Sequence, residues 1–237
     1  MKRIEKIPNI EAKFENQLVD SSGKSFKRVN PFLKGVNSIR PSNFSSYFYG
    51  TKVKKTQIVL HFTAGVLSGD MAALTKQFVS VPYVVARSGT TFELFNPDYW
   101  SYHLGSSKTY SNKDRSSSSL GIEISNIGPL VLKDDGFLYD VYGVVYCHKD
   151  DTAFYDHLAT PYRGYSYFAS FTEEQYTSLK ALIDQLVVKY DIAKELLSED
   201  QRFITFEQPI RTGIVSHAHY RADKFDLAPN FKYEKIL

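Results

Sequence analysis

Three possible zinc ligands lie in three separate segments of this 237-residue chain. His61 stands in VLHFTAG, His217 in VSHAH and Asp226 in DKFDLAP. Two imidazoles and one carboxylate leave a fourth tetrahedral position open for water, which is the ligand count of catalytic zinc and not of a closed structural site. The pattern therefore indicates a hydrolase that holds one Zn²⁺ per chain.

Two further side chains could act beside such an ion. Glu123 lies between Ile122 and Ile124 in SLGIEIS, and alternation along a strand would place it alone on the face opposite both isoleucines. Lys224 precedes Asp226 by two residues, so one short loop could present both to the metal. Taken singly, a strand Glu and a loop Lys are more often solvated surface residues.

The segments around these residues alternate between strand and helix patterns. Short apolar runs predict buried strands that carry His61, Glu123 and His217, and a hairpin turn at Arg87–Gly89 joins two more. Helices are predicted from about Gly69 to Phe78 and after a capping box; the box and the apolar positions that follow it are Thr172, Gln175, Leu179, Leu182, Ile183, Leu186, Val187 and Tyr190. This interleaving indicates a single α/β domain, a central mixed β-sheet flanked by helices with the zinc site at the strand ends.

Two regions lack so clear a pattern. Residues 1–48 contain Pro8, Pro31 and Pro41 among short apolar pieces and are interpreted as an irregular N-terminal extension whose aromatic residues pack on a catalytic domain of residues 49–237. Residues 126–170 are aromatic and are interpreted as long loops that form part of a binding wall.

Composition narrows the partners. A net charge of +3 without a run of Lys and Arg gives no indication of nucleic-acid binding. No apolar stretch reaches the length of a signal peptide or a membrane span, so we expect a chain made in the cytoplasm without an export signal. The single cysteine, Cys147, cannot form an internal disulfide.

Five segments, in order, resemble the zinc-dependent N-acetylmuramoyl-L-alanine amidases, a family that includes phage amidases, cell-wall recycling amidases and peptidoglycan recognition proteins. They cover roughly residues 56–231 and are VLHFTAG, YVVARSGTTFEL, SYHLG, LGIEISN and HAHYRADKFDLAPNF. The resemblance implies zinc on His61, His217 and Asp226, with Glu123 as general base and Lys224 as oxyanion donor. The bond cut would be the amide between N-acetylmuramic acid and L-alanine, in peptidoglycan or in muropeptides.

The resemblance also assigns His103 and Tyr102, in SYHLG, to the family's Trp-His-Ala-Gly loop. It implies that both line the substrate groove, although a core histidine is an alternative for His103. Aromatic residues such as Trp100 could stack on sugar faces, and packing is their alternative role.

Two departures from the family pattern leave alternatives open. The nine residues from His217 to Asp226 are one fewer than usual, so His219 remains a rival ligand. Some members carry a catalytic Tyr at the position that Val81 occupies here, and Tyr83 follows two residues later, which makes Tyr83 the next candidate if Glu123 is not the base.

The setting follows from the same resemblance. A phage lysis enzyme that a holin releases to the bacterial cell wall is the first expectation, and a cytoplasmic recycling enzyme is the second. An inactive peptidoglycan-binding module is the alternative from another class. A virion-associated wall-binding protein, attached through residues 1–48, is a further one.

Overall fold

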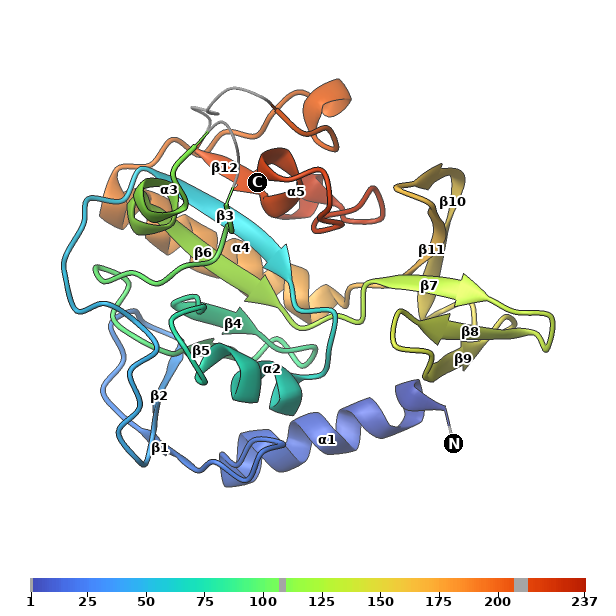
Figure 1. Ribbon diagram of the computed structural model, residues 1–237, viewed down its shortest axis with the longest axis horizontal. Coiled ribbons are helices and arrows are strands. Elements are labelled where there is room, and N and C mark those ends of the chain that lie inside the picture. Colours follow the sequence, from blue (N-terminus) through green and yellow to red (C-terminus); the bar gives the residue numbers. More distant parts are fainter. Residues whose placement is uncertain (1, 107–109, 207–212) are drawn as a thin grey trace.

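A mixed β-sheet forms the centre of the computed structural model, which describes residues 2–106, 110–206 and 213–237 (Figure 1). Within these residues it has seven strands, in the order β1 (Phe26–Arg28), β2 (Asn37–Pro41), β5 (Thr91–Glu93), β4 (Tyr83–Val85), β6 (Ser119–Ile124), β3 (Gln57–Phe62) and β12 (Ile214–Ser216). Strands β4, β6, β3 and β12 run parallel, whereas β4–β5 and β1–β2 are antiparallel. The predicted α/β fold with a mixed sheet is therefore confirmed, as is the hairpin between β4 and β5.

Helix α4 (Glu173–Tyr190) covers one face of this sheet. The predicted capping box is present, because Thr172 Oγ1 accepts from the Gln175 amide at 3.1 Å and Gln175 Oε1 accepts from the Thr172 amide at 3.1 Å. The helix buries an apolar stripe against the inward side chains of the strands; among the residues of this core are Leu179, Leu182, Ile183, Leu186, Ile58, Leu60, Ile122 and Ile124.

The other face carries α2 (Leu67–Leu74) and α1 (Arg3–Gln17). Helix α2 begins two residues before the predicted start and ends four residues before the predicted end, and its N-cap is Val66, so Ser68 does not cap it. The interpretation of residues 1–48 as irregular is wrong in part. Ile4, Ile7 and Phe14 recur at helical spacing and are buried on α1, but Pro8, inside the helix, lacks the N–H that an interior position uses and so argued against a helix.

Residues 126–170, interpreted from the sequence as long loops, form a second antiparallel sheet. Its five described strands lie in the order β10 (Tyr155–Tyr162), β11 (Tyr165–Ala169), β7 (Pro129–Leu132), β8 (Phe137–Asp140) and β9 (Val145–His148). The glycines of its turns, Gly136, Gly143 and Gly164, all have positive φ, as tight hairpin turns require. These short strands mix aromatic and polar residues, so their period of two was weak in the sequence.

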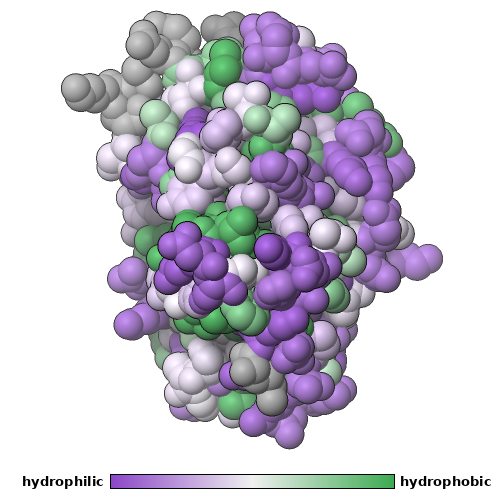
Figure 2. All heavy atoms as spheres, turned by 90° about the vertical axis from the view of Figure 1, so that its right-hand side faces the viewer, coloured by the Kyte–Doolittle hydropathy of each residue, from purple (hydrophilic) through white to green (hydrophobic). Residues whose placement is uncertain are grey.

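The second sheet projects to one side of the first, next to the start of α1. Figure 2 faces this side and shows apolar patches between hydrophilic groups. The exposed apolar side chains of the second sheet and its turns are Val131, Leu132, Val141, Tyr142, Val144 and Phe154.

The remaining elements are short. They are α3 (Asn112–Ser118), α5 (His217–Tyr220) and two 3₁₀ turns, η1 (Glu199–Gln201) and η2 (Tyr233–Lys235). In the described part of the chain, no helix combines the length and the apolarity that a membrane crossing needs.

Candidate metal centre and active site

Neighbouring parallel strands bring the three possible ligands together. His61 is the fifth residue of β3, His217 directly follows β12, and β12 pairs with β3 in parallel. Their carboxyl ends therefore meet at one edge of the sheet, and the loop after α5 returns Asp226 to the same point. All three residues are buried.

The donor atoms form a nearly equilateral triangle. His61 Nδ1 lies 3.0 Å from His217 Nδ1 and 3.1 Å from Asp226 Oδ2, and His217 Nδ1 lies 3.1 Å from the same oxygen. Tetrahedral zinc with bonds near its usual lengths needs donor atoms about 3.3 Å apart. The separations fall a few tenths of an ångström short of that value, so these residues fit a zinc ion with little movement.

The second nitrogen of His217 fixes how its ring is used. His217 Nε2 lies 2.9 Å from the Leu104 carbonyl oxygen, and a carbonyl can only accept, so the ring proton resides on Nε2. Nδ1 then keeps its lone pair toward the other donors, as a metal ligand must.

A longer chain of hydrogen bonds fixes His61 in the same way. Ser119 Oγ donates to the Arg115 carbonyl at 2.6 Å and so accepts from His103 Nε2 at 3.0 Å. His103 Nδ1 is then an acceptor, and His61 Nε2 donates to it at 3.0 Å. Both metal-facing nitrogens are therefore free of protons.

The ionisation of these groups suits a cation. Burial lowers the pKa of His61 to about 4, so its imidazole is neutral at pH 7. Burial opposes ionisation of Asp226, but the nearby His217 and His61 hold the pKa of its carboxyl well below the usual range. Neutral imidazoles and an ionised carboxylate are the states that bind a metal.

Glu123 stands beside His61. The two residues are register partners on the adjacent parallel strands β6 and β3, and partners on neighbouring strands point to the same face. Its flanking residues, Ile122 and Ile124, pack in the core under α4, which leaves Glu123 on the side of the donors. Burial, with the negative charges of Asp226 and Asp70, raises the pKa of Glu123 well above its usual value.

The Glu123 carboxylate also has a free buried atom, because Oε2 has no hydrogen-bond partner among the residues that the structure describes. A buried acceptor without a partner is costly. Unpartnered carboxylate oxygens are found where a proton or a ligand is to be received.

Lys224 lies in the tight turn before Asp226, where its amide donates to the Arg221 carbonyl at 3.2 Å. Its positive charge lowers the pKa of both Glu123 and His61, so it acts on the field at the donors. Within the described ranges, no ion pair or hydrogen bond holds its ammonium group.

Arg163, which the sequence analysis did not single out, fastens this turn. It stands between β10 and β11 and donates to the carbonyls of Arg221 at 3.0 Å, Ala218 at 3.2 Å and Lys224. One guanidinium thus ties the second sheet to the loop that carries Lys224 and Asp226. No local sequence signal marks this role, since it depends on contacts with residues 55 to 61 positions away.

With this geometry in place, a family model of N-acetylmuramoyl-L-alanine amidases matches residues 51–226. The chain belongs to the N-acetylmuramoyl-L-alanine amidase family. The resemblance predicted from the five sequence segments is confirmed.

Solved structures of amidases are similar in fold at low sequence identity. AmiD from E. coli, in complex with anhydro-N-acetylmuramic acid-L-Ala-D-γ-Glu-L-Lys, shares 19% identity with a TM-score of 0.47 over 79% of this chain. A selenomethionine derivative of AmpD gives 13% and 0.48, covering 86% of this chain and 94% of its own. AmpDh3 from Pseudomonas aeruginosa, with anhydromuramic pentapeptide, gives 17% and 0.49, covering 82% of this chain and 62% of its own. The chain spans 58% of the AmiD chain. A comparison with curated protein sequences gives no match.

The other predicted site residues of this amidase-family chain lie at different places. His103 is buried behind His61, and both of its ring nitrogens have protein partners. Gly121 makes room for it, since a Cβ there would lie 3.2 Å from His103 Cγ. Tyr102 instead lines a separate cavity of about 480 Å³ with Tyr49 and Trp100, whose rings lie 5.8 and 5.2 Å from its own.

The two rival residues have partners elsewhere. His219 Nδ1 accepts from the Ser216 amide at 2.9 Å and Nε2 donates to the Arg202 carbonyl at 2.6 Å, so neither nitrogen is available to a metal in this arrangement. Tyr83 pairs with Ile122 and packs in the core under α4, on the opposite face of the sheet from Glu123.

Proposed function

We propose that this chain is a zinc-dependent peptidoglycan hydrolase that cleaves the amide between N-acetylmuramic acid and L-alanine. The observation that carries the proposal is the triangle of two imidazole nitrogens and one carboxylate oxygen, 3.0 to 3.1 Å apart, beside the unpartnered carboxylate oxygen of Glu123. Membership of the amidase family supports the same bond.

His61, His217 and Asp226 would hold the ion, one per chain. When bound, Zn²⁺ supplies Lewis-acid activation of a water and of the scissile carbonyl. The Leu104 carbonyl and the chain through His103 and Ser119 serve this binding by keeping the ring protons on the far nitrogens of the two ligands.

Glu123 would move the proton. It takes one from the attacking water as the new C–O bond forms, and it gives that proton to the alanine nitrogen as the C–N bond breaks. The products are the lactyl carboxylate and the free amine of the peptide. A carboxyl whose pKa burial raises is better able to keep the proton between these two events than one in water.

Lys224 would stabilise the negative charge that develops on the carbonyl oxygen. A preorganised donor contributes most when it need not reorganise during the reaction. The three carbonyl contacts of Arg163 hold the turn of Lys224 and so supply that rigidity.

The test of metal and bond together uses purified protein and intact sacculi. We expect about one zinc per chain, and mass spectrometry of the digest should show free L-alanyl peptides and intact glycan strands. His61→Ala and Asp226→Ala should lose both zinc and activity, because two protein ligands hold the ion poorly. Wild-type protein that carries zinc and binds sacculi but releases no peptide would be a recognition module, and the proposal would be wrong.

The lysis setting is proposed on the same basis. An enzyme that a holin delivers should clear a suspension of host cells whose inner membrane has been permeabilised. An enzyme of cell-wall recycling should instead prefer soluble muropeptides over sacculi by a large factor in turnover. Attachment to a virion through residues 1–48 predicts that removal of α1 abolishes phage association and leaves the chemistry intact.

A further inference from the structure

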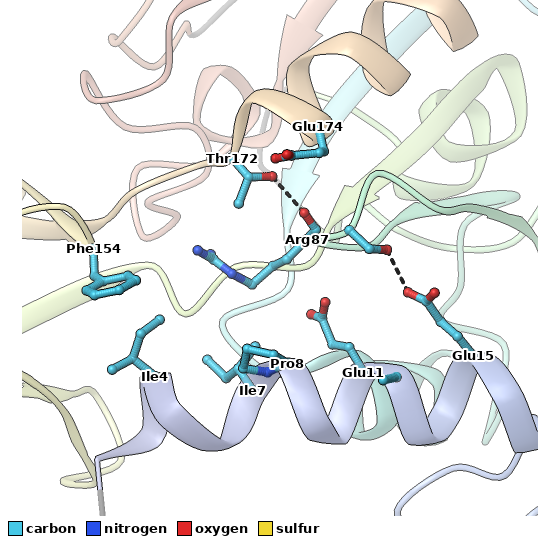
Figure 3. Close-up of a pocket in the computed structure, with 11 residues that line it drawn as sticks. Ile4, Ile7, Pro8, Glu11, Glu15, Arg87, Phe154, Thr172 and Glu174 are labelled. Carbon is cyan, nitrogen blue, oxygen red and sulfur yellow. Dashed lines mark hydrogen bonds between the residues drawn. The ribbon is translucent and has the colours of Figure 1, made fainter.

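A second cavity lies between α1, the turn after β4 and the start of α4 (Figure 3). Its volume is about 490 Å³, and none of its lining residues belongs to the proposed metal centre. Ile4, Ile7, Pro8 and Phe154 give it an apolar wall. The size and the apolar lining are those of sites for small ligands, which add a few convergent polar groups for orientation.

One such group is Glu11, whose carboxylate points into this cavity (Figure 3). Glu11 is only 4% exposed, and its Oε1 has no hydrogen-bond partner among the described residues. Burial raises the pKa of Glu11 to about 7. A buried carboxylate without a partner costs folding free energy, which a bound cation would recover.

The neighbouring cation does not neutralise it. Arg87 donates from Nη1 to the Ser170 carbonyl at 3.1 Å, and the described residues contain no ion pair between Arg87 and Glu11. Two further carboxylates, Glu15 and Glu174, line the same cavity. Three acidic groups against one guanidinium leave the cavity negative, so its charge favours a cationic ligand.

Glu15 shows what a partnered carboxylate looks like in the same place. It lies one helical turn after Glu11 and accepts from Ser88 Oγ at 2.6 Å and from Thr90 Oγ1 at 3.1 Å. Its needs are met by the protein, whereas those of Glu11 are not.

We propose that this cavity binds an aliphatic primary ammonium, the group that a lysine side chain or a free alkylamine presents. The ammonium would donate to Glu11 Oε1, and its chain would lie along Ile4, Ile7 and Phe154. A compact ammonium suits a single free oxygen, whereas a guanidinium is best bound by both oxygens of a carboxylate. The site is independent of the proposed amidase chemistry, since it shares no residue with it.

The experiment titrates two probes into the zinc-loaded full chain at pH 8, where Glu11 is mostly ionised. The probes are n-pentylammonium chloride and Nα-acetyl-lysine N-methylamide, followed by amide chemical shifts in NMR spectra. We expect saturable shifts at α1, the β4–β5 turn and the start of α4. Glu11→Gln should weaken binding at least tenfold, as expected for loss of a charge-assisted hydrogen bond. Binding of both probes, or of n-pentylammonium alone, would identify a peptide lysine or a free amine as the occupant.

Glu15→Gln is the matched control, because it removes a carboxylate from the same helix face that already has partners. We expect its affinity to stay within threefold of wild type. The proposal is overturned if Glu11→Gln binds as tightly as wild type, if the uncharged n-pentanol binds as tightly as n-pentylammonium, or if 50 mM probe leaves these segments unshifted. Glu11→Gln keeps the side chain's shape and removes a buried charge, so it should fold, and its melting temperature checks this.

Discussion

Replacing His103 by leucine tests whether the structure behind the metal donors matters for metal binding. In the wild type, His61 Nε2 donates to His103 Nδ1 at 3.0 Å. Leucine offers no acceptor at that place. The His61 ring must then either bury an N–H without a partner or move its proton to Nδ1, the nitrogen that faces His217 and Asp226.

The magnitude follows from either outcome. A buried donor without a partner costs about 1 to 3 kcal/mol, and His61 is 2% exposed, so water cannot replace His103. Loss of such outer partners typically weakens metal binding by about 10- to 100-fold, which corresponds to about 1.4 to 2.7 kcal/mol. The two ranges agree, and we expect the zinc dissociation constant of His103→Leu to rise by one to two orders of magnitude.

The assay is equilibrium competition for zinc with a chromogenic chelator, together with the visible absorption of the cobalt-substituted protein. His103→Gln is the conservative variant, because its amide oxygen can accept from His61, and it should recover most of the affinity. Ser119→Ala should have a smaller effect than His103→Leu, since it only releases the far nitrogen of His103. A zinc affinity of His103→Leu within twofold of wild type, with an unchanged cobalt spectrum, would refute this reasoning.

Three further predictions concern Glu123, Lys224 and Glu11. Glu123→Gln should bind zinc normally and lose about 100- to 10,000-fold in turnover on muramyl peptides; near-normal turnover would exclude it as the base. Lys224→Ala should keep zinc and lower turnover by about 100- to 1,000-fold with little change in sacculus binding, and a loss confined to binding would contradict the oxyanion role. Because burial raises the pKa of Glu11 from 4.5 to about 7, the folded state holds a proton that the unfolded state has released between these values, and stability falls as pH rises through them. Wild type should lose up to about 3 kcal/mol relative to Glu11→Gln between pH 4.5 and 8, measured by urea unfolding; parallel pH profiles would show that Glu11 is not responsible.

Elements with a strong local pattern could be predicted from the sequence. The apolar runs of β3 and β6, the capping box of α4 and the turn at Gly89 are recorded in neighbouring residues, and each determines its own backbone. The alternation in SLGIEIS likewise indicated that Glu123 leaves the face of its two isoleucines. Helix α1 and the second sheet were missed because Pro8 and short mixed strands weaken that local pattern, and packing against other elements stabilises them instead.

The sequence by itself determined which side chains could do the chemistry, since residue type and order already suggested two histidines, an aspartate, a glutamate and a lysine. Only the tertiary structure decided how they meet. Donors 156 and 165 residues apart from His61 lie within 3.1 Å of it because β3 pairs with β12 and β6, and an apolar strand pattern does not specify its neighbours. The protein partners of His103, the hold of Arg163 on the Lys224 turn and the unpartnered Glu11 depend on the same long-range pairing. Side-chain alternation fixes the face of a strand, whereas the packing of the whole chain fixes what lies across from it.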